Sequence, residues 1–485
     1  MKPFLSSRAM READRHTIED IGIPGFTLME SAGRAAAALL EGATGVGVVC
    51  GKGNNAGDGL VVARVLAERG VEVRVHFVAG TDALSADTER NLAILEATGN
   101  PALSLTDHLE DLAGCRLLVD AMLGTGQSAA PRPPFDSAVE WMNRQPVRRV
   151  ALDVPTGLDA DTGHTPGATV RADMTVSMGA VKTGMLIGNG PEVCGRIEVA
   201  EIGIPRSVLQ ARTDEELSGH LADDDFVRSV WPVRARLAHK YTTGPVVVIG
   251  GSAKYPGAPV LAATAAARVG SGYVAAALPE GVPWTGPAEI PVVATNEVHS
   301  WTDRARAILL GPGLGRGDAA AARVRSVLES ATCPVVVDAD GLRAASDLGL
   351  LQCAAVLTPH AGEFRHMTGQ DIQHSVRDAR TWASRWNAVL LLKGAPTVIA
   401  HPDGRVVLCT AGGASLATAG TGDVLGGLCA GLIAMGLAPF EAAVAASHAG
   451  GAAAERFSAG RGNASMMASD LVRQLPFVLS ERFHL

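Results

Sequence analysis

The fold of the first half follows from one stretch, VGVVCGKGNNAGDG at residues 46–59. Its apolar start, Val46–Cys50, predicts a strand that is buried on both faces, which is typical of a parallel sheet. The glycines that follow indicate a tight turn, and the chain then continues as a helix through Ala63-Arg64. A strand that leads through such a turn into a helix indicates a doubly wound α/β fold.

The same alternation continues on both sides of this stretch. Upstream, the apolar residues Met10, Ala13, Ile18 and Ile21 predict one helix, and residues 27–41 predict a second. Further strands of the first half are predicted at residues 71–78, 117–120, 149–154, 174–178 and 197–200.

The pattern restarts in the second half of the chain. Strands are predicted there at residues 246–251, 273–277, 307–310, 335–338, 355–358 and 389–393. Asp403-Gly404 predicts a hairpin turn that joins residues 397–401 to residues 405–409. No internal repeat is visible. We therefore predict an α/β protein made of two doubly wound domains.

A polar, poorly periodic stretch at residues 206–225 lies between the two halves, and we interpret it as a linker. A boundary near residue 215 gives domains of residues 1–215 and 216–485. The length of 485 residues is about three times the ~150 residues of a typical domain, which agrees with more than one domain.

Composition excludes several classes of protein. With 47% hydrophobic and 19% charged residues, the chain is not globally disordered. A net charge of -8 argues against nucleic acid or an anionic membrane as the main partner. The longest uncharged run lies between Asp423 and Glu441; glycines and Pro439 interrupt it, so it favours a buried core helix over a membrane span.

The seven cysteines are odd in number and widely spaced, and no C-x-x-C pair occurs. This pattern supports neither a zinc ribbon nor a disulfide scaffold, and it favours buried thiols in a reducing compartment. The chain turns polar at Ser6-Ser7-Arg8 before an apolar segment develops, so we expect no secretory signal. We expect a cytoplasmic homo-oligomer that binds no nucleic acid and no membrane.

Polar side chains follow three predicted strands of the first half. Asn54, Asn55 and Asp58 follow one strand, and Asp120 and Asp153 end two others. In an open α/β sheet, ligands bind outside the carboxyl ends of the strands, so these groups are expected to converge on one crevice. A turn without a ligand, and an aspartate that only caps a helix, are the alternatives for each position taken singly.

The strongest cluster of the second half is GGASLATAGTGDVLGG at residues 412–427. The amides of Gly420, Thr421, Gly422 and Asp423 can bind an anion at the start of the following helix. Asp423 would then stand beside the phosphates, where it could take a proton from an attacking hydroxyl. A glycine turn with a helix-capping aspartate is the alternative. Further polar strand ends are at Gly311–Gly315, Asp338–Gly341, His360 and Lys393.

These motifs resemble a known family over roughly residues 8–480. The first half resembles the N-terminal domain of bifunctional NAD(P)H-hydrate repair enzymes, which epimerises the R and S forms of hydrated NAD(P)H. The second half is similar to the ribokinase-like superfamily, and specifically to its ADP- or ATP-dependent NAD(P)H-hydrate dehydratases. The resemblance implies an N-terminal Rossmann-like epimerase domain and a C-terminal ribokinase-like domain.

For the first half, the resemblance implies contacts with the hydrate at two loops and at Asp153, which we also take as catalytic. The loop residues are Asn54, Asn55, Ala56, Gly57 and Asp58, and Gly124, Thr125, Gly126, Gln127, Ser128, Ala129 and Ala130. It also implies a potassium ion held by Asn55, Asp120 and Thr156, and oxygen ligands suit such a hard cation. Ala56 stands where the family usually has glycine, and Thr156 stands where it usually has serine.

For the second half, the resemblance implies hydrate contacts at Ala258, Gly313, His360 and Asp423, with Asp423 catalytic. It implies ADP contacts at Lys393, Gly394, Ala395, Pro396 and Thr397, and at Gly422, next to Gly420 and Thr421. Ala361 stands where proline is commoner in the family.

The implied reaction phosphorylates the hydroxyl of the S hydrate with ADP and Mg²⁺ and then expels phosphate, which gives NAD(P)H, AMP and phosphate. One alternative is a small-molecule kinase, of the pyridoxal or hydroxyethylthiazole type, with an accessory N-terminal binding domain. Another is a first half that binds without catalysis. The motifs GPGLG and TPHxGE, together with the fused first half, favour the dehydratase.

Overall fold

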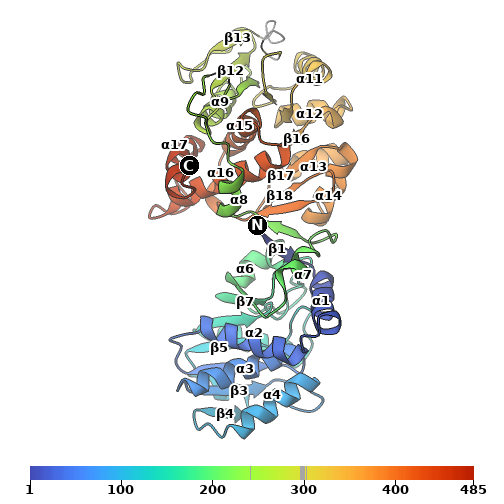
Figure 1. Ribbon diagram of the computed structural model, residues 1–485, viewed down its shortest axis with the longest axis vertical. Helices are drawn as coiled ribbons and strands as arrows, with labels where there is room; N and C mark the ends of the chain where they lie inside the picture. The colour runs from blue at the N-terminus through green and yellow to red at the C-terminus, as the bar shows by residue number, and fades with distance from the viewer. Residues whose placement is uncertain (241, 295–300, 302) are drawn as a thin grey trace. The chain divides into compact units, whose positions relative to one another are not determined.

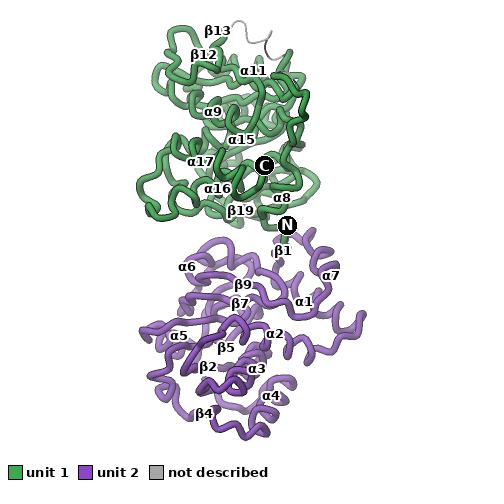
Figure 2. Tube along the Cα trace, turned by 60° about the vertical axis from the view of Figure 1, so that its left-hand side comes forward, with its two compact units in different colours: residues 1–2, 220–485 green, residues 3–219 purple. Residues whose placement is uncertain are grey.

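The computed structural model describes residues 1–240, 242–294, 301 and 303–485, and it divides into two compact units (Figures 1 and 2). One unit is Pro3–Gly219, and the other comprises Met1–Lys2 and His220–Leu485. The chain therefore passes from one unit to the other after Gly219. The assignment of one activity to residues 1–215 and of another to residues 216–485 stays a prediction.

The first unit is built on a seven-stranded sheet in the order β4-β3-β2-β5-β6-β7-β9, and all its strand pairs are parallel. The sheet strands are β2 Val46–Cys50, β3 Val73–Phe77, β4 Leu103–Thr106, β5 Leu117–Ala121, β6 Arg148–Leu152, β7 Met174–Met178 and β9 Arg196–Ala200. The helices are α1 Ser7–Arg15, α2 Gly25–Leu39, α3 Asn54–Glu68, α4 Ala86–Ala97, α5 Phe135–Arg144, α6 Gly190–Cys194 and α7 Arg206–Gln210.

Helices cover both faces of this sheet. A large core joins β2, β3 and β5 to α2 and α3, which lie over one face of the sheet (Figure 1). A smaller core packs α5 against Val49 and Leu118 on the opposite face. Two short strands, β1 Lys2–Leu5 and β8 Val181–Lys182, pair in parallel outside the seven-stranded sheet. The doubly wound fold predicted for this half is confirmed.

The second unit has the sheet order β13-β12-β11-β14-β15-β16-β17-β18-β19-β10. Strands β11 to β17 pair in parallel, and β17, β18 and β19 pair antiparallel. The strands are β10 Gly219–Leu221, β11 Pro245–Ile249, β12 Tyr273–Leu278, β13 Val292–Ala294, β14 Ala307–Leu310, β15 Val335–Val337, β16 Val356–Leu357, β17 Val389–Leu392, β18 Thr397–Ala400 and β19 Val406–Cys409.

The helices of the second unit also cover both faces of its sheet. They are α8 Asp224–Val230, α9 Ala258–Arg268, α11 Asp318–Ser330, α12 Asp340–Asp347, α13 Ala361–Thr368, α14 Ser375–Trp386, α15 Thr421–Ala434, α16 Pro439–Ser458 and α17 Ala468–Glu481. A core joins α9, α15, α16 and α17 to one face, and α14 packs against β17 and β18 (Figure 1). Alternate strand residues such as Val247, Ile308 and Val337 are buried too, so neither face is open to solvent.

The predicted strands are confirmed within a few residues, and the predicted hairpin is β18–β19. Two helix predictions were wrong in extent. The first helix ends at Arg15 and a π-turn follows, which leaves Ile18 and Ile21 39% and 44% exposed. The uncharged run forms α15 and the start of α16, because the chain breaks at Gly436, which has a φ of 109°.

The stretch interpreted as a linker folds into short elements: α7, β10 and the start of α8. The seven cysteines are free thiols, and five of them are buried. Cys333 is half-buried and Cys353 is exposed, so the prediction of buried thiols is wrong for these two. No helix in the described part of the chain is both long and apolar enough to cross a membrane.

Candidate active sites

The first candidate site lies where the strand order of the first unit reverses. The chain runs from β2 outward to β4 and then returns to place β5 on the other side of β2. A crevice forms at such a switch point, outside the carboxyl ends of the strands. The loops after β2, β5 and β6 carry the predicted residues of the first half, so the topology brings them to one edge.

Gly124 shows how closely these three loops approach one another. A Cβ atom at this glycine would stand 3.1 Å from Oδ2 of Asp153 and 3.6 Å from Cβ of Asn55. The backbone amide of Thr125 donates to the same Asp153 oxygen at 3.1 Å. The structure therefore brings Asn55, the loop at residues 124–130 and Asp153 together. Within that loop Ser128, Ala129 and Ala130 are exposed.

Asp120 is buried at the end of β5 and is held by Thr156. The amide and hydroxyl of Thr156 both donate to its carboxylate at 2.8 Å, and the Met122 amide donates at 3.2 Å. Burial raises the pKa of Asp120 to about 6, although these hydrogen bonds lower it. Asp120 lies on β5 and caps no helix, so the alternative that it is only a helix-capping aspartate is excluded.

The residues assigned to potassium have the right chemistry for that ion. Both polar atoms of the buried Asn55 amide lack a hydrogen-bond partner among the described residues. A buried amide oxygen that lacks a partner among the described residues is a ligand that suits a hard cation, as are the carboxylate of Asp120 and the hydroxyl of Thr156. Among the described residues, no group of three or more His, Cys, Asp and Glu side chains is arranged to hold a metal ion.

Sequence reasoning missed Lys182, the cation of the first site. Its side chain is 1% exposed, and its Nζ lies 2.5 Å from Oδ1 of Asp153. It also donates to Ser177 Oγ at 3.1 Å and to the Met178 carbonyl at 2.8 Å. A single lysine inside the apolar segment around Val181 was the available signal. The contact with Lys182 fixes the Asp153 side chain, and the Asp153 backbone has a left-handed φ of 65°.

Two further carboxyl groups face this ion pair. Burial raises the pKa of Asp58 well above its ordinary value, and the charges of Asp153 and Asp14 add to the shift. Burial likewise raises the pKa of Asp14 to about 6. Neither carboxyl makes a hydrogen bond to another described residue. The site thus holds Asp153, which is paired with Lys182, beside Asp58, whose pKa is raised by burial. Asp14 had not been predicted, although it follows Met10 by four residues on one helix face.

The second candidate site lies at the corresponding switch point of the second unit, between β11 and β14. Here Gly313, which has a φ of 63°, approaches the start of α9 so closely that a Cβ atom would stand 3.0 Å from Cβ of Ala258. The Ser252 hydroxyl donates to the Gly313 carbonyl at 2.8 Å and fixes this approach. The predicted hydrate contacts Ala258 and Gly313 are therefore neighbours.

Asp423 occupies the first turn of α15. Gly420 is the N-cap residue, in the left-handed conformation with a φ of 90°, so Asp423 is not the helix cap that the sequence left open. Its carboxylate makes no hydrogen bond or ion pair with any other described residue. Burial raises the pKa of Asp423 to about 7, with a further increase from Asp338 that Lys393 opposes.

Lys393 joins the loops after β15, β16 and β17. Its Nζ donates to Asp338 at 2.9 Å, lies 3.7 Å from Glu363, and would stand 3.5 Å from a Cβ atom at Gly422. The nearby carboxylates raise the pKa of Lys393 although burial lowers it. The ammonium group therefore faces the amides at the start of α15, where an anion would bind.

His360 lies beside Lys393 on the neighbouring strand. Its Nδ1 accepts hydrogen bonds from the amides of Gly362 and Glu363 at 3.0 and 3.3 Å. A neutral imidazole that accepts at Nδ1 carries its proton on Nε2, and the Nε2 of His360 lies 3.5 Å from Oε1 of Glu363. The remaining predicted ADP contacts, residues 394–397, form the turn between β17 and β18, where the Thr397 hydroxyl donates to the Gly394 carbonyl at 3.3 Å.

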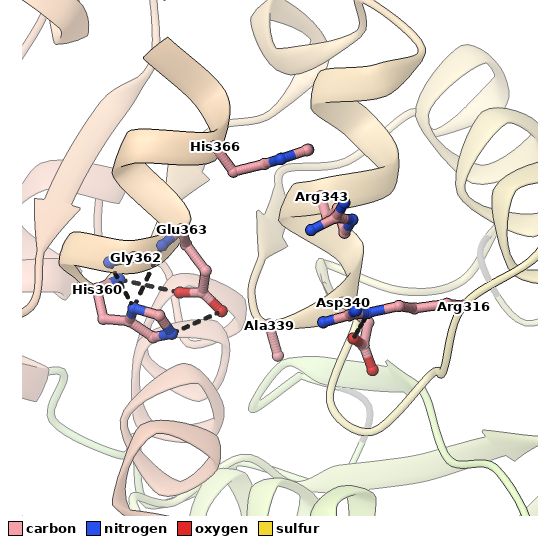
Figure 3. Close-up of a pocket in the computed structure, with 8 residues that line it drawn as sticks. All are labelled: Arg316, Ala339, Asp340, Arg343, His360, Gly362, Glu363 and His366. Atoms are coloured by element: carbon pink, nitrogen blue, oxygen red, sulfur yellow. Dashed lines mark hydrogen bonds and ion pairs between the residues drawn. The ribbon is translucent and has the colours of Figure 1, made fainter. Parts of the chain in front are cut away.

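A pocket of about 170 Å³ opens beside His360 (Figure 3). His360, Glu363 and His366 line it from the start of α13 and its first turns. Arg343 and Asp340 line it from α12, and Arg316 lines it from the loop after β14. Sequence reasoning had not singled out these two arginines.

Comparison with known proteins covers both halves. The family model described as YjeF-related protein N-terminus matches residues 25–184, and the model described as NAD(P)H-hydrate dehydratase matches residues 246–477. The bifunctional NAD(P)H-hydrate repair enzyme Nnr of Salinibacter ruber is 45% identical over 99% of this chain and 97% of its own length.

Solved structures match the second half. A ribokinase-like superfamily protein of Enterococcus faecalis is 23% identical with a TM-score of 0.50, covering 54% of this chain and 95% of its own. An ADP/ATP-dependent NAD(P)H-hydrate dehydratase of Bacillus subtilis, co-crystallised with ATP and Mg²⁺, is 31% identical with a TM-score of 0.48, covering 55% of this chain and 99% of its own. The expected ribokinase-like fold is confirmed.

Proposed function

Because the chain belongs to the family of bifunctional NAD(P)H-hydrate repair enzymes, we propose that it salvages hydrated NAD(P)H through two separate reactions. The first unit interconverts the R and S hydrates, and the second unit dehydrates the S hydrate at the expense of ADP. A kinase with an accessory binding domain is disfavoured, since the bifunctional relative matches 99% of this chain across both halves.

The unpartnered carboxylate of Asp423 is the observation that carries the dehydration. In the hydrate, the hydroxyl stands on the carbon next to the ring nitrogen. Asp423 takes the proton of this hydroxyl while the oxygen attacks the terminal phosphate of ADP, and AMP leaves. The lone pair of the ring nitrogen then expels phosphate. Loss of a proton from the adjacent carbon, to the departing phosphate, restores the double bond of NAD(P)H.

The surroundings of Asp423 suit this transfer. Amides at the start of α15, at Gly420 to Gly422, and the ammonium of Lys393 face the charge that develops on the transferred group. Magnesium, when bound with the nucleotide, adds positive charge at the phosphate oxygens. The carboxylates of Asp338 and Glu363 could hold it together with those phosphates and water.

The epimerisation uses the two carboxyl groups of the first site. If the ring opens, the hydroxyl oxygen loses a proton and the ring nitrogen gains one; if water leaves and returns, the departing hydroxyl gains a proton and the returning water loses one. We assign Asp58, whose raised pKa favours its protonated form, as the group that gives a proton, and Asp153, which is paired with Lys182, as the group that accepts one. Asn55, Asp120 and Thr156 would hold potassium, which supplies positive charge beside this pair.

The potassium site has its own test. We expect epimerisation to be faster in K⁺ than in Li⁺, and Asn55→Ala to abolish that difference, because its amide oxygen has no other partner. The control is the rate of dehydration of the S hydrate. The change from K⁺ to Li⁺ should affect this rate equally in the wild type and in Asn55→Ala. An unchanged preference for K⁺ in Asn55→Ala would refute the assignment.

The whole proposal is tested by incubating the purified chain with mixed hydrates, Mg²⁺ and either ADP or ATP while NADH absorbance and the epimer ratio are followed. We expect NADH to form with ADP, giving AMP and phosphate, and the ratio to equilibrate without nucleotide. Activity with ATP but not with ADP would overturn the assignment of ADP as the phosphoryl donor, but not the proposed type of reaction. A cytoplasmic location and a homo-oligomer stay predictions from the sequence.

A further inference from the structure

We propose that the pocket beside His360 binds a phosphate group of the dinucleotide hydrate through Arg343, Arg316 and His360. This inference rests on the proposed dehydration, because it places part of the same substrate. The pocket of about 170 Å³ holds a phosphate group and a few waters, but it is too small for a whole dinucleotide.

The donors of the pocket come from three separate elements and face one space (Figure 3). Arg343 makes no hydrogen bond or ion pair with any other residue that the structure describes. Arg316 is 75% exposed, and among the residues that the structure describes it pairs with Asp340 alone, at 3.9 Å. His360 lines the same pocket, and its Nε2 makes a long contact of 3.5 Å with Oε1 of Glu363. Guanidinium groups and an imidazole N–H match the several acceptor oxygens of a phosphate.

The two carboxylates that line the same pocket are already engaged. Glu363 accepts the His360 amide at 2.9 Å and lies near Lys393, and Asp340 accepts the Gly315 amide at 2.9 Å. Their charges are therefore partly compensated, whereas the charge of Arg343 is not. The imbalance favours an anionic ligand over a cation.

The backbone supports a ligand-binding role for this pocket. Ala339, which lines it, has a φ of 51°, a conformation that non-glycine residues rarely adopt and that clusters at binding sites. Ala339 is the N-cap residue of α12, and Arg343 follows it within the first turns of that helix. Since His360 is also a predicted hydrate contact, one substrate can reach both places.

The test compares Arg343→Gln with Arg365→Gln in the full chain. Arg365 lies on α13, outside the pocket, and its side chain pairs with Asp371, so the control removes an equal charge nearby. We expect Arg343→Gln to raise KM for the S hydrate about tenfold. The values of kcat and of KM for ADP should stay unchanged, and Arg343→Lys should recover part of the loss.

Two arms identify which phosphate binds. A rise in KM for both the NADH and the NADPH hydrates indicates the pyrophosphate, and a rise for the NADPH hydrate alone indicates the 2′-phosphate. Binding of NADH and NADPH to each variant can also be titrated by nicotinamide fluorescence, where no reaction occurs. The variants should rank in Kd as they do in KM.

An unchanged KM for both hydrates, or a rise in KM for ADP alone, would overturn the inference and leave the proposed function intact. A wild-type chain that regenerates no NAD(P)H from the hydrate would instead overturn the proposed function, and the inference with it.

Discussion

Asp423 combines a half-buried carboxylate with a pKa that burial raises to about 7. A base must be deprotonated to act, so its active fraction grows as the pH rises through this value. We expect kcat/KM for dehydration to increase about tenfold per pH unit below the pKa and to level off above about pH 8. Epimerisation, followed in the same samples, should not share this profile. A dehydration rate that is flat across that range would contradict the role of Asp423 as base.

Lys182 is the residue on which the charge of the first site depends. Lys182→Met leaves the Asp153 carboxylate, which is 14% exposed, without its cation, which costs at most about 3–5 kcal/mol and should lower the unfolding temperature. Epimerisation should fall by at least ~10²-fold, as for loss of a catalytic base. Adding Asp153→Asn removes both charges and should recover much of the stability but none of the activity. Epimerisation restored in the double variant would refute this role.

Some site residues could be predicted from the sequence and others could not, for a physical reason. Asn55, Asp120, Asp153 and Asp423 end predicted strands or begin helices, so their positions follow from the rule for parallel sheets. Lys182 lies on a two-residue strand, and its contact with Asp153 depends on tertiary packing that no local pattern encodes.

At the scale of elements, glycines decide how closely α15 packs against α9. A Cβ atom at Gly427 would stand 2.1 Å from the Ala262 carbonyl oxygen, and that oxygen belongs to backbone that cannot move aside. Gly427→Ala should therefore destabilise the second unit by about 1–3 kcal/mol, measured as a lower thermal unfolding midpoint. Gly450→Ala in α16 is the matched control: its Cβ would make only ordinary contact, at 3.4 Å. Equal midpoints for the two variants would contradict this account.

The central strands could be predicted because their residues are almost all apolar, as in β2 and β17. Short strands such as β10 and β13 were missed, since three residues carry too little periodicity. The π-turn after Arg15 was missed for another reason: Ile18 and Ile21 continue the apolar spacing of a helix but are exposed.

At the scale of the molecule, the first unit should fold and epimerise by itself when it ends at Gly219. The hydroxyl of Ser218 accepts the buried Ser6 amide at 3.0 Å, so a fragment of residues 1–215 leaves that amide without its partner. We expect the fragment of residues 1–219 to unfold at a higher temperature than that of residues 1–215. Equal unfolding temperatures would contradict this prediction and would show that residues 1–215 already contain the complete folded unit.

The central claim is that two sites act in sequence on one substrate. The most direct measurement supplies the pure R hydrate with ADP and follows NADH absorbance for Asp423→Asn, for Asp153→Asn and for their mixture. The account predicts no NADH from the first, NADH only at the uncatalysed epimerisation rate from the second, and a rate close to that of the wild type from the mixture. NADH formed at the wild-type rate by Asp423→Asn alone, or a mixture no faster than Asp153→Asn, would contradict it.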